Sequence, residues 1–355
     1  MVLNYCKNSN KHTVNIVIDI AHPAHVNFFK FTAKRLLSEG HNVTVLCLDR
    51  GKLSKIVEKE FPSFHIEIVG KHKGSKYSVI VDANIKRFFQ LIIILRYLKA
   101  DVGLGVGSFN FGGVLKILNR PNIQFDDDPE RGLNTILEKL TATKLFFPPI
   151  IESYGNIRNF KALKEWAYLS PTYFTPDPSV IIDYGLKEKE YIFIREISTG
   201  SLNYTNQKAN ILASISKEFN KDIKVLLSLE NKKKLGYYPD NWILLKEPVN
   251  DIHSILYYSK CVISSGDSMA REGSLLGVPS IYCGFRDMKA NNIMENKNIL
   301  FHLKPKDVAP FVNRIFNDNS YYQNQEKYRT NLLNEWVDVN EFIYNEVMKI
   351  INNMN

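Results

Sequence analysis

The chain has few cysteines, and none of them stands in a pattern that binds metal. The four cysteines, Cys6, Cys47, Cys261 and Cys283, lie far apart, and no two form a CxxC pair. This spacing is not that of a zinc ribbon or of a dithiol redox motif. Three of the four lie in apolar runs, where a free thiol behaves as a small hydrophobic side chain. We therefore expect a protein of the reducing cytoplasm.

Long hydrophobic runs are also missing. The longest, FFQLIIILRYL at residues 88–98, is about half of what a bilayer span requires. The first 20 residues lack an apolar core followed by a small-residue cleavage site, so we predict no signal peptide and no transmembrane segment. The basic, apolar segment IKRFFQLIIILRYLK at residues 85–99 has two interpretations. It is either a peripheral contact with an anionic membrane or a buried helix with exposed basic ends.

Acidic residues are fewer than basic ones. The chain has 46 Lys and Arg against 37 Asp and Glu, which gives a net charge of +9 and favours anionic partners such as nucleotides, nucleic acid or acidic membranes. The lysines are scattered apart from short runs such as residues 232–234, so we do not expect nucleic acid as the partner. An apolar share of 45% indicates a globular fold, and 355 residues favour two domains.

The first half of the chain alternates strand and helix patterns. Apolar, β-branched runs predict strands at residues 14–20, 42–48, 64–70, 100–107 and 121–128. Apolar residues at helical spacing predict helices at residues 26–41, 52–61, 85–99 and 111–119. This order is typical of α/β proteins with a doubly wound, mostly parallel sheet.

The second half repeats the pattern after a proline-rich stretch. Three prolines within eight residues predict a linker at residues 170–186. Beyond it we expect strands at 190–198, 222–230, 241–247, 261–266 and 279–285, and helices at 206–219, 251–259 and 268–277. Residues 331–353 are predicted as a helix with Trp336, Phe342, Ile343 and Val347 on one stripe, long enough to pack across a domain junction. The chain therefore predicts two αβ domains in series with a cleft between them.

The first candidate site follows the first predicted strand, in DIAHPAHVNFF at residues 19–29. Ligands of open parallel sheets bind beyond the carboxyl ends of strands, where Asp19, His22 and His25 stand. An imidazole near a carboxylate can act as a general base near neutral pH. These three residues are therefore candidate catalytic residues. In the alternative interpretation, His25 caps the helix and His22 binds the sheet edge.

A glycine-rich loop, GVGSFNFGG at residues 105–113, follows the fourth predicted strand. Its glycines let the backbone come close to another chain segment or to a ligand, and Ser108 and Asn110 add hydrogen-bonding groups. The loop has neither a GxGxxG pattern nor the lysine of a phosphate-binding loop. The loop is consistent both with contact to an acceptor substrate and with tight contacts inside the protein.

Three consecutive acids, Asp126 to Asp128, follow the fifth predicted strand in FDDDPE. They would repel one another unless they are solvated, cap the following helix or meet a cation. Capping with solvation is the favoured interpretation over a divalent metal, so we assign no metal site. Asp127 is a candidate contact for an acceptor substrate.

Two loops of the second half suit a diphosphate. Arg195 lies at a predicted strand end, where the paired N–H donors of its planar guanidinium can bind a diphosphate. Ser198 and Thr199 can add hydrogen bonds. In SSGDSMAREGSLLGVPSI, at residues 264–281, a polar turn of Gly266, Asp267 and Ser268 opens into a helix. The N–H groups and the dipole at such a helix start attract anions.

Glu272 lies in the first turns of that helix. A carboxylate there is favourable for the dipole and can accept hydrogen bonds from two ribose hydroxyls. The alternative is a capping-box acid that needs no ligand.

The segment GDSMAREGSLLGVPSI resembles the donor-site signature of GT-B proteins, especially the lipid-linked N-acetylglucosaminyl transferase of peptidoglycan synthesis and the non-hydrolysing UDP-N-acetylglucosamine 2-epimerase. Together with DIAHPAHVNFF and DDDPE, it resembles a GT-B-type family described only as a domain of unknown function, from archaea and bacterial polysaccharide gene clusters. The resemblance implies a GT-B fold, two Rossmann-like domains with parallel sheets facing a cleft and a C-terminal helix that crosses back. The domains would be 1–170 for the acceptor, 171–330 for the nucleotide-sugar and 331–355 for the helix across the junction.

The resemblance also implies roles for single residues. Glu272 would be the ribose ligand, Ser268 and Met269 phosphate-side backbone contacts, and Arg195 part of a diphosphate-binding loop. Relatives keep a catalytic histidine or acceptor contacts in the loop that holds His22 and His25.

The implied activity is a metal-independent, cofactor-free glycosyltransferase that uses a nucleotide-sugar, a UDP-sugar, in cell-surface polysaccharide or glycolipid biosynthesis. Its partners would be a saccharide or lipid-linked acceptor and, peripherally, the cytoplasmic face of the inner membrane. In an inverting displacement, Asp19 or His25 would take the acceptor proton. The alternatives are a UDP-N-acetylglucosamine 2-epimerase or UDP-sugar hydrolase, and a non-catalytic binding protein. The chain departs from the epimerase, because IAHPAH replaces a GTRPE-like start and paired acids become Arg271 and Glu272.

Overall fold

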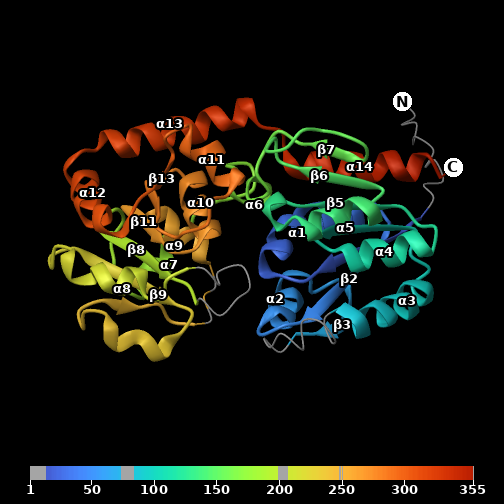
Figure 1. Cartoon of the computed structure of the whole chain (residues 1–355), viewed down its shortest axis with the longest axis horizontal. Coiled ribbons are helices and arrows are strands. Elements are labelled where there is room, and N and C mark those ends of the chain that lie inside the picture. Colours follow the sequence, from blue (N-terminus) through green and yellow to red (C-terminus); the bar gives the residue numbers. More distant parts are fainter. Residues whose placement is uncertain (1–12, 73–83, 199–206, 248, 250, 355) are drawn as a thin grey trace, which may run out of the picture. The chain divides into compact units, whose positions relative to one another are not determined.

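The computed structural model describes residues 13–72, 84–198, 207–247, 249 and 251–354 (Figure 1). The chain divides into two compact units, which we call unit 1 (residues 1–167 and 338–355) and unit 2 (residues 168–337). The division at residue 167 lies close to the predicted boundary at residue 170. The last 18 residues return to the first unit rather than forming a third part of the chain.

Unit 1 contains a parallel sheet that, among the described residues, has seven strands in the order β3-β2-β1-β4-β5-β6-β7. The five predicted strands are confirmed, whereas β6 and β7 were not predicted. The strands are β1 (Asn15–Ile20), β2 (Asn42–Asp49), β3 (His65–Lys71), β4 (Val102–Val106), β5 (Asn122–Phe125), β6 (Lys144–Phe147) and β7 (Ile157–Asn159).

Helices cover the sheet of unit 1 and pack on it through apolar side chains. Leu91 and Leu95 of one helix and Phe111 of the next join Val17 and Leu46 of the strands in one buried cluster. Burial of such side chains is the main favourable term in folding. The helices of the unit are α1 (Pro23–Ser38), α2 (Leu53–Glu60), α3 (Arg87–Tyr97), α4 (Phe109–Ile117), the 3-10 turn η2 (Pro129–Arg131), α5 (Leu133–Thr141) and α14 (Val339–Asn352).

The glycines around residues 105–113 serve tight internal contacts. A Cβ atom at Gly103 would lie 2.2 Å from Leu115, and one at Gly105 would lie 2.6 Å from the side-chain oxygen of Gln124. A Cβ atom at Gly112 would lie 3.1 Å from Asn122. Of the two interpretations of this loop, the structure therefore supports close approach between α4 and the sheet.

The prediction of a single helix over residues 331–353 is wrong. α13 (Ser320–Glu335) ends before Trp336, and α14 begins at Val339. The carboxylate of Asp338 accepts hydrogen bonds from the backbone N–H groups of Asn340 (2.9 Å) and Glu341 (3.1 Å), so it is an N-cap that starts a new helix. An Asp followed by an acid three residues later is a start signal that outweighs the continuous apolar stripe.

The last helix is anchored in unit 1. The ring of Phe342 meets Phe146 edge-on at 5.0 Å and stacks on Phe160 at 5.7 Å. The hydroxyl of Thr32 in α1 donates to Asn340 (3.1 Å). These contacts explain why the end of the chain belongs to the first unit.

Unit 2 contains a second parallel sheet, with six strands in its described part and the order β10-β9-β8-β11-β12-β13. The five predicted strands are confirmed, and β13 was not predicted. The strands are β8 (Tyr191–Glu196), β9 (Lys224–Leu229), β10 (Ile243–Leu244), β11 (Cys261–Ser264), β12 (Ser280–Tyr282) and β13 (Leu300–His302).

The predicted linker at residues 170–186 lies within unit 2 and includes a short helix. The helices around this sheet are mostly short. They are α6 (Trp166–Leu169, at the division between the units), α7 (Ser179–Ile182), α8 (Ile211–Ile215), η4 (Ser216–Glu218), η5 (Lys232–Tyr237), α9 (Ile252–Tyr258), α10 (Asp267–Leu275), α11 (Lys289–Glu295), α12 (Pro305–Asn317) and α13.

Cys47, Cys261 and Cys283 are buried free thiols in the cores of the two units, as predicted, whereas Cys6 lies outside the described residues. Within the described part of the chain, no helix is both long and apolar enough to cross a membrane.

Candidate functional site

The first candidate site lies where β11 leads into α10 in unit 2. Gly266 is the N-cap residue, with an extended backbone (φ −107°, ψ 140°), and having no side chain it gives no side-chain cap to the helix. The first N–H groups of a helix have no partners within the helix, and they lie at the positive end of its dipole. The predicted change from polar loop to helix is thereby confirmed, with α10 starting at Asp267.

The turn before α10 is held by buried side chains. The hydroxyl of Ser264 donates to the Gly266 carbonyl (2.7 Å) and accepts from the Gly266 N–H (3.0 Å). The hydroxyl of Ser265 donates to Glu196 (2.8 Å) and accepts from the N–H of Ile197 (3.0 Å). A Cβ atom at Gly266 would lie 2.8 Å from Ile197, so the glycine is needed for this close approach. The start of α10 is therefore held in place before any ligand arrives.

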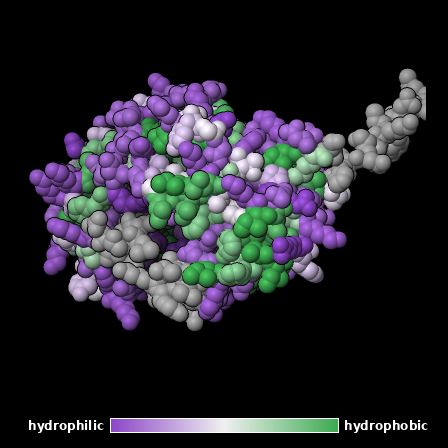
Figure 2. Space-filling model, turned by 45° about the vertical axis from the view of Figure 1, so that its right-hand side comes forward, coloured by the Kyte–Doolittle hydropathy of each residue, from purple (hydrophilic) through white to green (hydrophobic). Residues whose placement is uncertain are grey.

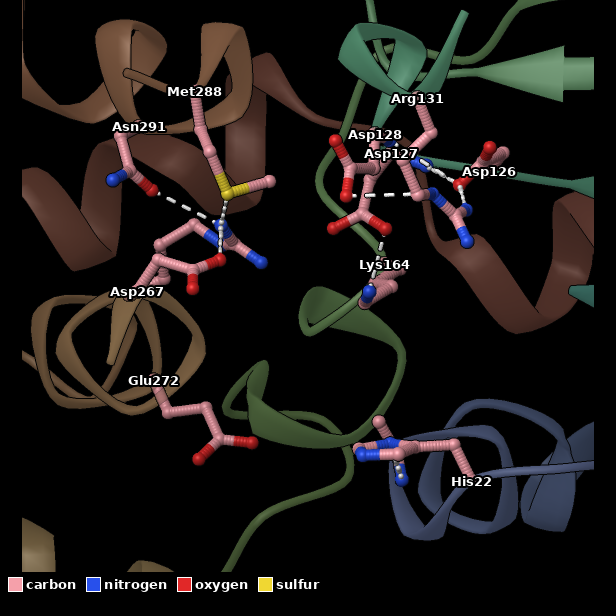
Figure 3. Close-up of polar contacts among 12 residues, drawn as sticks. His22, Asp126, Asp127, Asp128, Arg131, Lys164, Asp267, Glu272, Met288 and Asn291 are labelled. Atoms are coloured by element: carbon pink, nitrogen blue, oxygen red, sulfur yellow. Dashed lines mark hydrogen bonds and ion pairs between the residues drawn. The ribbon is translucent and has the colours of Figure 1, made fainter. Parts of the chain in front are cut away.

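The side chain of Asp267 is turned into the unit, so a nucleotide contact through its carboxylate is ruled out, whereas a contact through its backbone N–H stays a prediction. Its side chain is buried and pairs with the guanidinium of Arg271 (3.2 Å), one turn along the helix. The same guanidinium donates to Asn291 (3.0 Å) and contacts the sulfur of Met288 (Figure 3). Arg286 lies 3.7 Å from the other oxygen of Asp267. This carboxylate is part of an internal ion-pair network.

Glu272 lies on a different side of α10, with Ser268, which is exposed, and Met269, which is half-buried. Its Oε1 accepts a hydrogen bond from the hydroxyl of Tyr168 (2.7 Å) and lies 3.5 Å from Nε2 of His253. Burial acts to raise the pKa of Glu272, but His253 and the Tyr168 hydroxyl outweigh it and hold the pKa below its ordinary value. Glu272 is therefore ionised at neutral pH and fixed in direction.

Aromatic rings surround this carboxylate, and sequence reasoning missed them. The ring of His253, on α9, lies 5.2 Å from that of Tyr168 and 6.5 Å from that of Phe174. Phe174 also contacts Tyr257 at 5.9 Å. The predicted N-cap Asp251 is confirmed, since it accepts from the N–H of Ser254 (3.0 Å). It fixes the start of α9 and so places His253, but the sequence carried no signal that this histidine meets Glu272.

Arg195 is at the end of β8, as expected, but its guanidinium is already bound. It donates to the hydroxyl of Ser228 (2.7 Å) and to Glu230 (2.8 Å). The other oxygen of Glu230 accepts from the N–H of Ser198 (2.8 Å). Because Glu230 neutralises this charge, the prediction that the guanidinium of Arg195 binds a diphosphate is corrected: in the structure it binds Ser228 and Glu230. Thr199 lies outside the described residues.

In unit 1, Asp19 is fully buried and is not an accessible base. Both of its oxygens accept hydrogen bonds from the guanidinium of Arg87, and the distance between Nη1 of Arg87 and Oδ2 of Asp19 is 3.3 Å. The hydroxyl of Ser108 also donates to Oδ2. The predictions of Asp19 as a catalytic residue and of Ser108 as an acceptor contact are therefore wrong. Asn110 donates to Asn84 (2.8 Å) and is half-buried, so its acceptor role stays a prediction.

The two histidines lie at the start of α1, and both use Nδ1 as an acceptor. His22 is the N-cap and accepts from the N–H of Ala24 (3.2 Å), whereas His25 accepts from the N–H of Ala21 (3.3 Å). The cap is thus His22, not His25. Burial, followed by the charges of His22 and Lys164, lowers the pKa of His25 well below its ordinary value. A neutral ring that accepts at Nδ1 carries its proton on Nε2, so Nε2 of His25 donates and does not fit a general base.

The three acids after β5 are buried and paired with side-chain cations, so their interpretation as solvated helix caps is wrong. Arg131 lies 2.7 Å from Asp126 and 3.4 Å from Asp128, and Lys164 lies 2.6 Å from Asp127 (Figure 3). Asp128 makes no side-chain cap to η2. Asp127 is near His25 and acts to raise its pKa. Its acceptor role stays a prediction, with its charge balanced by Lys164.

Glu138 of α5 adds a fourth acid to this cluster. It is fully buried, and burial, together with the charge of Asp126, raises its pKa to about 10. Glu138 is therefore protonated at neutral pH, and its proton faces the carboxylate of Asp126. Among the described residues, no group of three or more His, Cys, Asp and Glu side chains has the arrangement of a metal site.

Solved structures establish the fold. The glycosyltransferase VinC, solved in complex with dTDP, is 11% identical and superposes with a TM-score of 0.67, over 96% of this chain and 100% of VinC. A candidate UDP-N-acetylglucosamine 2-epimerase from Listeria monocytogenes is 10% identical, with a TM-score of 0.67 over 93% of this chain and 94% of the other. The chain has the GT-B fold of two Rossmann-like units with parallel sheets.

The chain is also similar in sequence to an archaeal protein. The uncharacterized protein MJ0665 from Methanocaldococcus jannaschii is 25% identical over 284 residues, which cover 76% of this chain and 82% of the relative. The model of the protein family of unknown function DUF354 matches residues 14–352. The chain belongs to this family, DUF354.

Proposed function

We propose that this protein is a glycosyltransferase that takes a sugar from a nucleotide-sugar, a UDP-sugar, and passes it to a saccharide or lipid-linked acceptor. The observation that carries the proposal is the start of α10, where a helix without a side-chain cap is followed, one turn later, by an ionised and oriented Glu272. The GT-B fold supports it, since enzymes that transfer sugars share this fold.

The spacing along α10 suits a nucleoside diphosphate. The N–H groups of residues 267–269 would bind the phosphates, and Glu272 would accept hydrogen bonds from ribose hydroxyls. Residues 268 and 272 are separated by about 6 Å along the helix axis, roughly the reach from the ribose hydroxyls to the phosphate on the same nucleoside. Tyr168 and His253 hold Oε1 in place, so binding would not have to order this side chain.

Stabilisation of the departing diphosphate would come from the positive end of α10, so the proposed reaction is independent of a metal. Charge that develops on the leaving group meets fixed N–H dipoles, which need no rearrangement during the reaction. Because Glu230 occupies Arg195, the proposal gives that arginine no direct role in this step.

On the acceptor side, the proposal keeps His22, His25, Asn110 and Asp127 but changes the role of the histidines. Each histidine presents Nε2 as a donor, because Nδ1 is bound to a backbone N–H group. They would orient the acceptor through hydrogen bonds rather than remove its proton. As the acceptor oxygen bonds to the anomeric carbon and the bond from that carbon to the diphosphate breaks, the acceptor's proton would pass to water. The motifs shared with the polysaccharide-cluster family support a place in cell-surface polysaccharide or glycolipid assembly. A lipid-linked acceptor requires peripheral contact with the cytoplasmic face of a membrane.

The test is calorimetric titration of the full chain with UDP, dTDP, GDP and CDP, with dTDP included because VinC was solved with it. We expect one nucleotide to bind, and Glu272→Gln to weaken its binding by roughly 1–3 kcal/mol, the cost of losing charge-assisted hydrogen bonds. Glu335→Gln is the matched control, since Glu335 is a surface acid of unit 2 that is paired with Lys297 (2.6 Å). Failure of all four nucleotides to bind, or equal affinity for wild type and Glu272→Gln, would overturn the proposal.

A second candidate is a UDP-N-acetylglucosamine 2-epimerase or a UDP-sugar hydrolase. It is favoured by the superposition on the candidate epimerase from Listeria monocytogenes, whose TM-score of 0.67 equals that of VinC. Incubation with UDP-N-acetylglucosamine in the absence of an acceptor separates the two. A transferase leaves most of the compound intact, whereas an epimerase or hydrolase turns it over.

A further inference from the structure

Three neighbouring helices of unit 1 carry an unusual concentration of exposed apolar side chains. The described residues include 16 large hydrophobic side chains that are exposed, and eight of them belong to α3, to the turn before it, to α4 and to α5. We call this set the α3–α5 face. Its members are Ile85, Phe89, Ile93, Tyr97, Ile117, Leu133, Ile136 and Leu140.

The residues of the face recur at helical spacing. Ile85, Phe89, Ile93 and Tyr97 are four residues apart and so lie on one side of α3, whereas Leu91 and Leu95 point into the core. In α5, residues 133, 136 and 140 form a similar row, and Glu138 points inward. α3 therefore has two apolar sides, of which the core covers only one, whereas α5 turns its apolar row outward and its buried Glu138 inward.

The three helices adjoin one another. A Cβ atom at Gly113 of α4 would lie 3.8 Å from Phe88 of α3 and 3.4 Å from Thr141 of α5, so both helices approach α4 closely. The amine of Lys116 in α4 donates to the carbonyl of Leu140 at the end of α5 (2.6 Å). The exposed rows therefore belong to one continuous surface, and Figure 2 shows hydrophobic side chains (green) gathered in patches at the surface of the molecule. Large continuous apolar patches are rare on the surfaces of proteins that contact only water.

The charges on α3 and α4 have one sign, whereas an exposed acid, Glu130, precedes α5. Residues 85–99 and 108–120 together contain six Lys and Arg residues and no Asp or Glu. Of these cations, Lys86, Arg96, Lys99 and Lys116 are exposed, whereas Arg120 pairs with Asp101 (3.5 Å). A second copy of the chain, docked by the usual two-fold symmetry, would bring these cations against one another. An anionic bilayer instead offers hydrocarbon for the apolar rows and phosphates for the cations.

We propose that the α3–α5 face docks the protein onto the surface of an anionic lipid bilayer. The apolar rows enter the interface, and the flanking cations contact lipid phosphate groups. The inference rests on the proposed function only in that docking would bring the enzyme to a lipid-linked acceptor. The surface itself involves none of the residues assigned to nucleotide binding.

The test is flotation of the full chain with vesicles of phosphatidylcholine alone and of phosphatidylcholine mixed with phosphatidylglycerol. We expect wild type to bind only the anionic vesicles, and the variant Phe89→Ser with Ile93→Ser to partition about ten-fold less, since two large apolar side chains are lost from the interface. Ile182→Ser is the matched control, because Ile182 of unit 2 is 70% exposed, the same as Ile93. It should bind vesicles like wild type.

The cations are tested separately. Lys86→Glu with Lys99→Glu should abolish the preference for anionic vesicles, whereas Lys232→Glu with Lys233→Glu, a pair exposed on unit 2, should not. Absence of wild-type binding to anionic vesicles, or unchanged binding by the Phe89 and Ile93 variant, would overturn the proposal. A wild-type dimer in sedimentation that this variant loses would assign the face to a second copy instead. Nucleotide titration of the same variant should match wild type, so failure of docking is distinguishable from failure of the proposed function.

Discussion

The buried carboxyl of Glu138 gives a stability prediction whose size follows from the structure. Glu138 lies against Asp126 in the interior of unit 1, where burial and that neighbouring charge raise its pKa to about 10. Glu138→Gln keeps the shape of the side chain and keeps a donor toward Asp126, but the amide cannot ionise. The variant therefore imitates the protonated state at every pH.

The sign follows from proton counting. Above pH 4.5, the ordinary pKa of the group, the unfolded chain loses this proton, whereas the folded chain keeps it up to about pH 10. The folded state then binds more protons than the unfolded state, so this group makes stability fall as pH rises through that window. The slope for one proton is about 1.4 kcal/mol per pH unit. Between pH 6 and pH 8 the wild type should therefore lose about 3 kcal/mol relative to Glu138→Gln.

Guanidinium denaturation at pH 6, 7 and 8, followed by circular dichroism, measures this difference. We expect the free energies of unfolding of the two proteins to diverge in favour of Glu138→Gln as pH rises. Glu335→Gln, which changes a partly exposed acid, should give a curve parallel to that of wild type. If the curves of Glu138→Gln and wild type stay parallel from pH 6 to pH 8, Glu138 is ionised in the folded protein and the proton assignment in this cluster is refuted.

Three further predictions concern the charged groups of the two units. Asp19→Asn should destabilise the fold by roughly 3–5 kcal/mol in urea denaturation, because it leaves the charge of Arg87 buried without its partner. If Asp19 were instead an accessible catalytic base, the same substitution would reduce activity and leave the free energy of unfolding nearly unchanged. His253→Ala should raise the pKa of Glu272, so that nucleotide affinity measured by calorimetry declines at a higher pH on acidification than in wild type; identical pH profiles would contradict the contact. His25→Gln, which can still donate, should keep more transferase activity than His25→Ala, whereas equal inactivity of both would restore the base role.

The fold could be predicted to a large extent, because long strands leave a strong pattern. β1, β2 and β8 are buried, β-branched or apolar runs of six to eight residues, and such runs stand out in a sequence. β7 and β13 have three residues each, of which only one is buried, so they leave no apolar run in the sequence. The division of the C-terminal helix was missed for another reason, because the apolar stripe continues on both sides of Asp338 and masked the capping signal of Asp338 and Glu341.

The partners of buried charges could not be predicted from sequence neighbours. Asp19 pairs with Arg87, which is 68 residues away, and Asp127 pairs with Lys164, which is 37 residues away. Each acid stands at a strand end, where a ligand-binding role is a reasonable expectation. Only the fold shows that a cation from elsewhere in the same unit already satisfies it. The same applies to Arg195, which Glu230 neutralises.

The helix α10 is different, because its period alone separates core residues from site residues. Successive residues turn by about 100° around a helix, so positions four apart lie within about 40° of each other, and positions five apart are about 140° apart. Asp267 and Arg271 therefore share one side and Ser268 and Glu272 share another, so the side chains of Asp267 and Glu272 cannot both reach one ligand. The structure has Asp267 paired internally and Glu272 held by Tyr168 and His253. The inward pair fixes the helix start in unit 2, and under the proposed function the outward pair, Ser268 and Glu272, would meet a nucleotide.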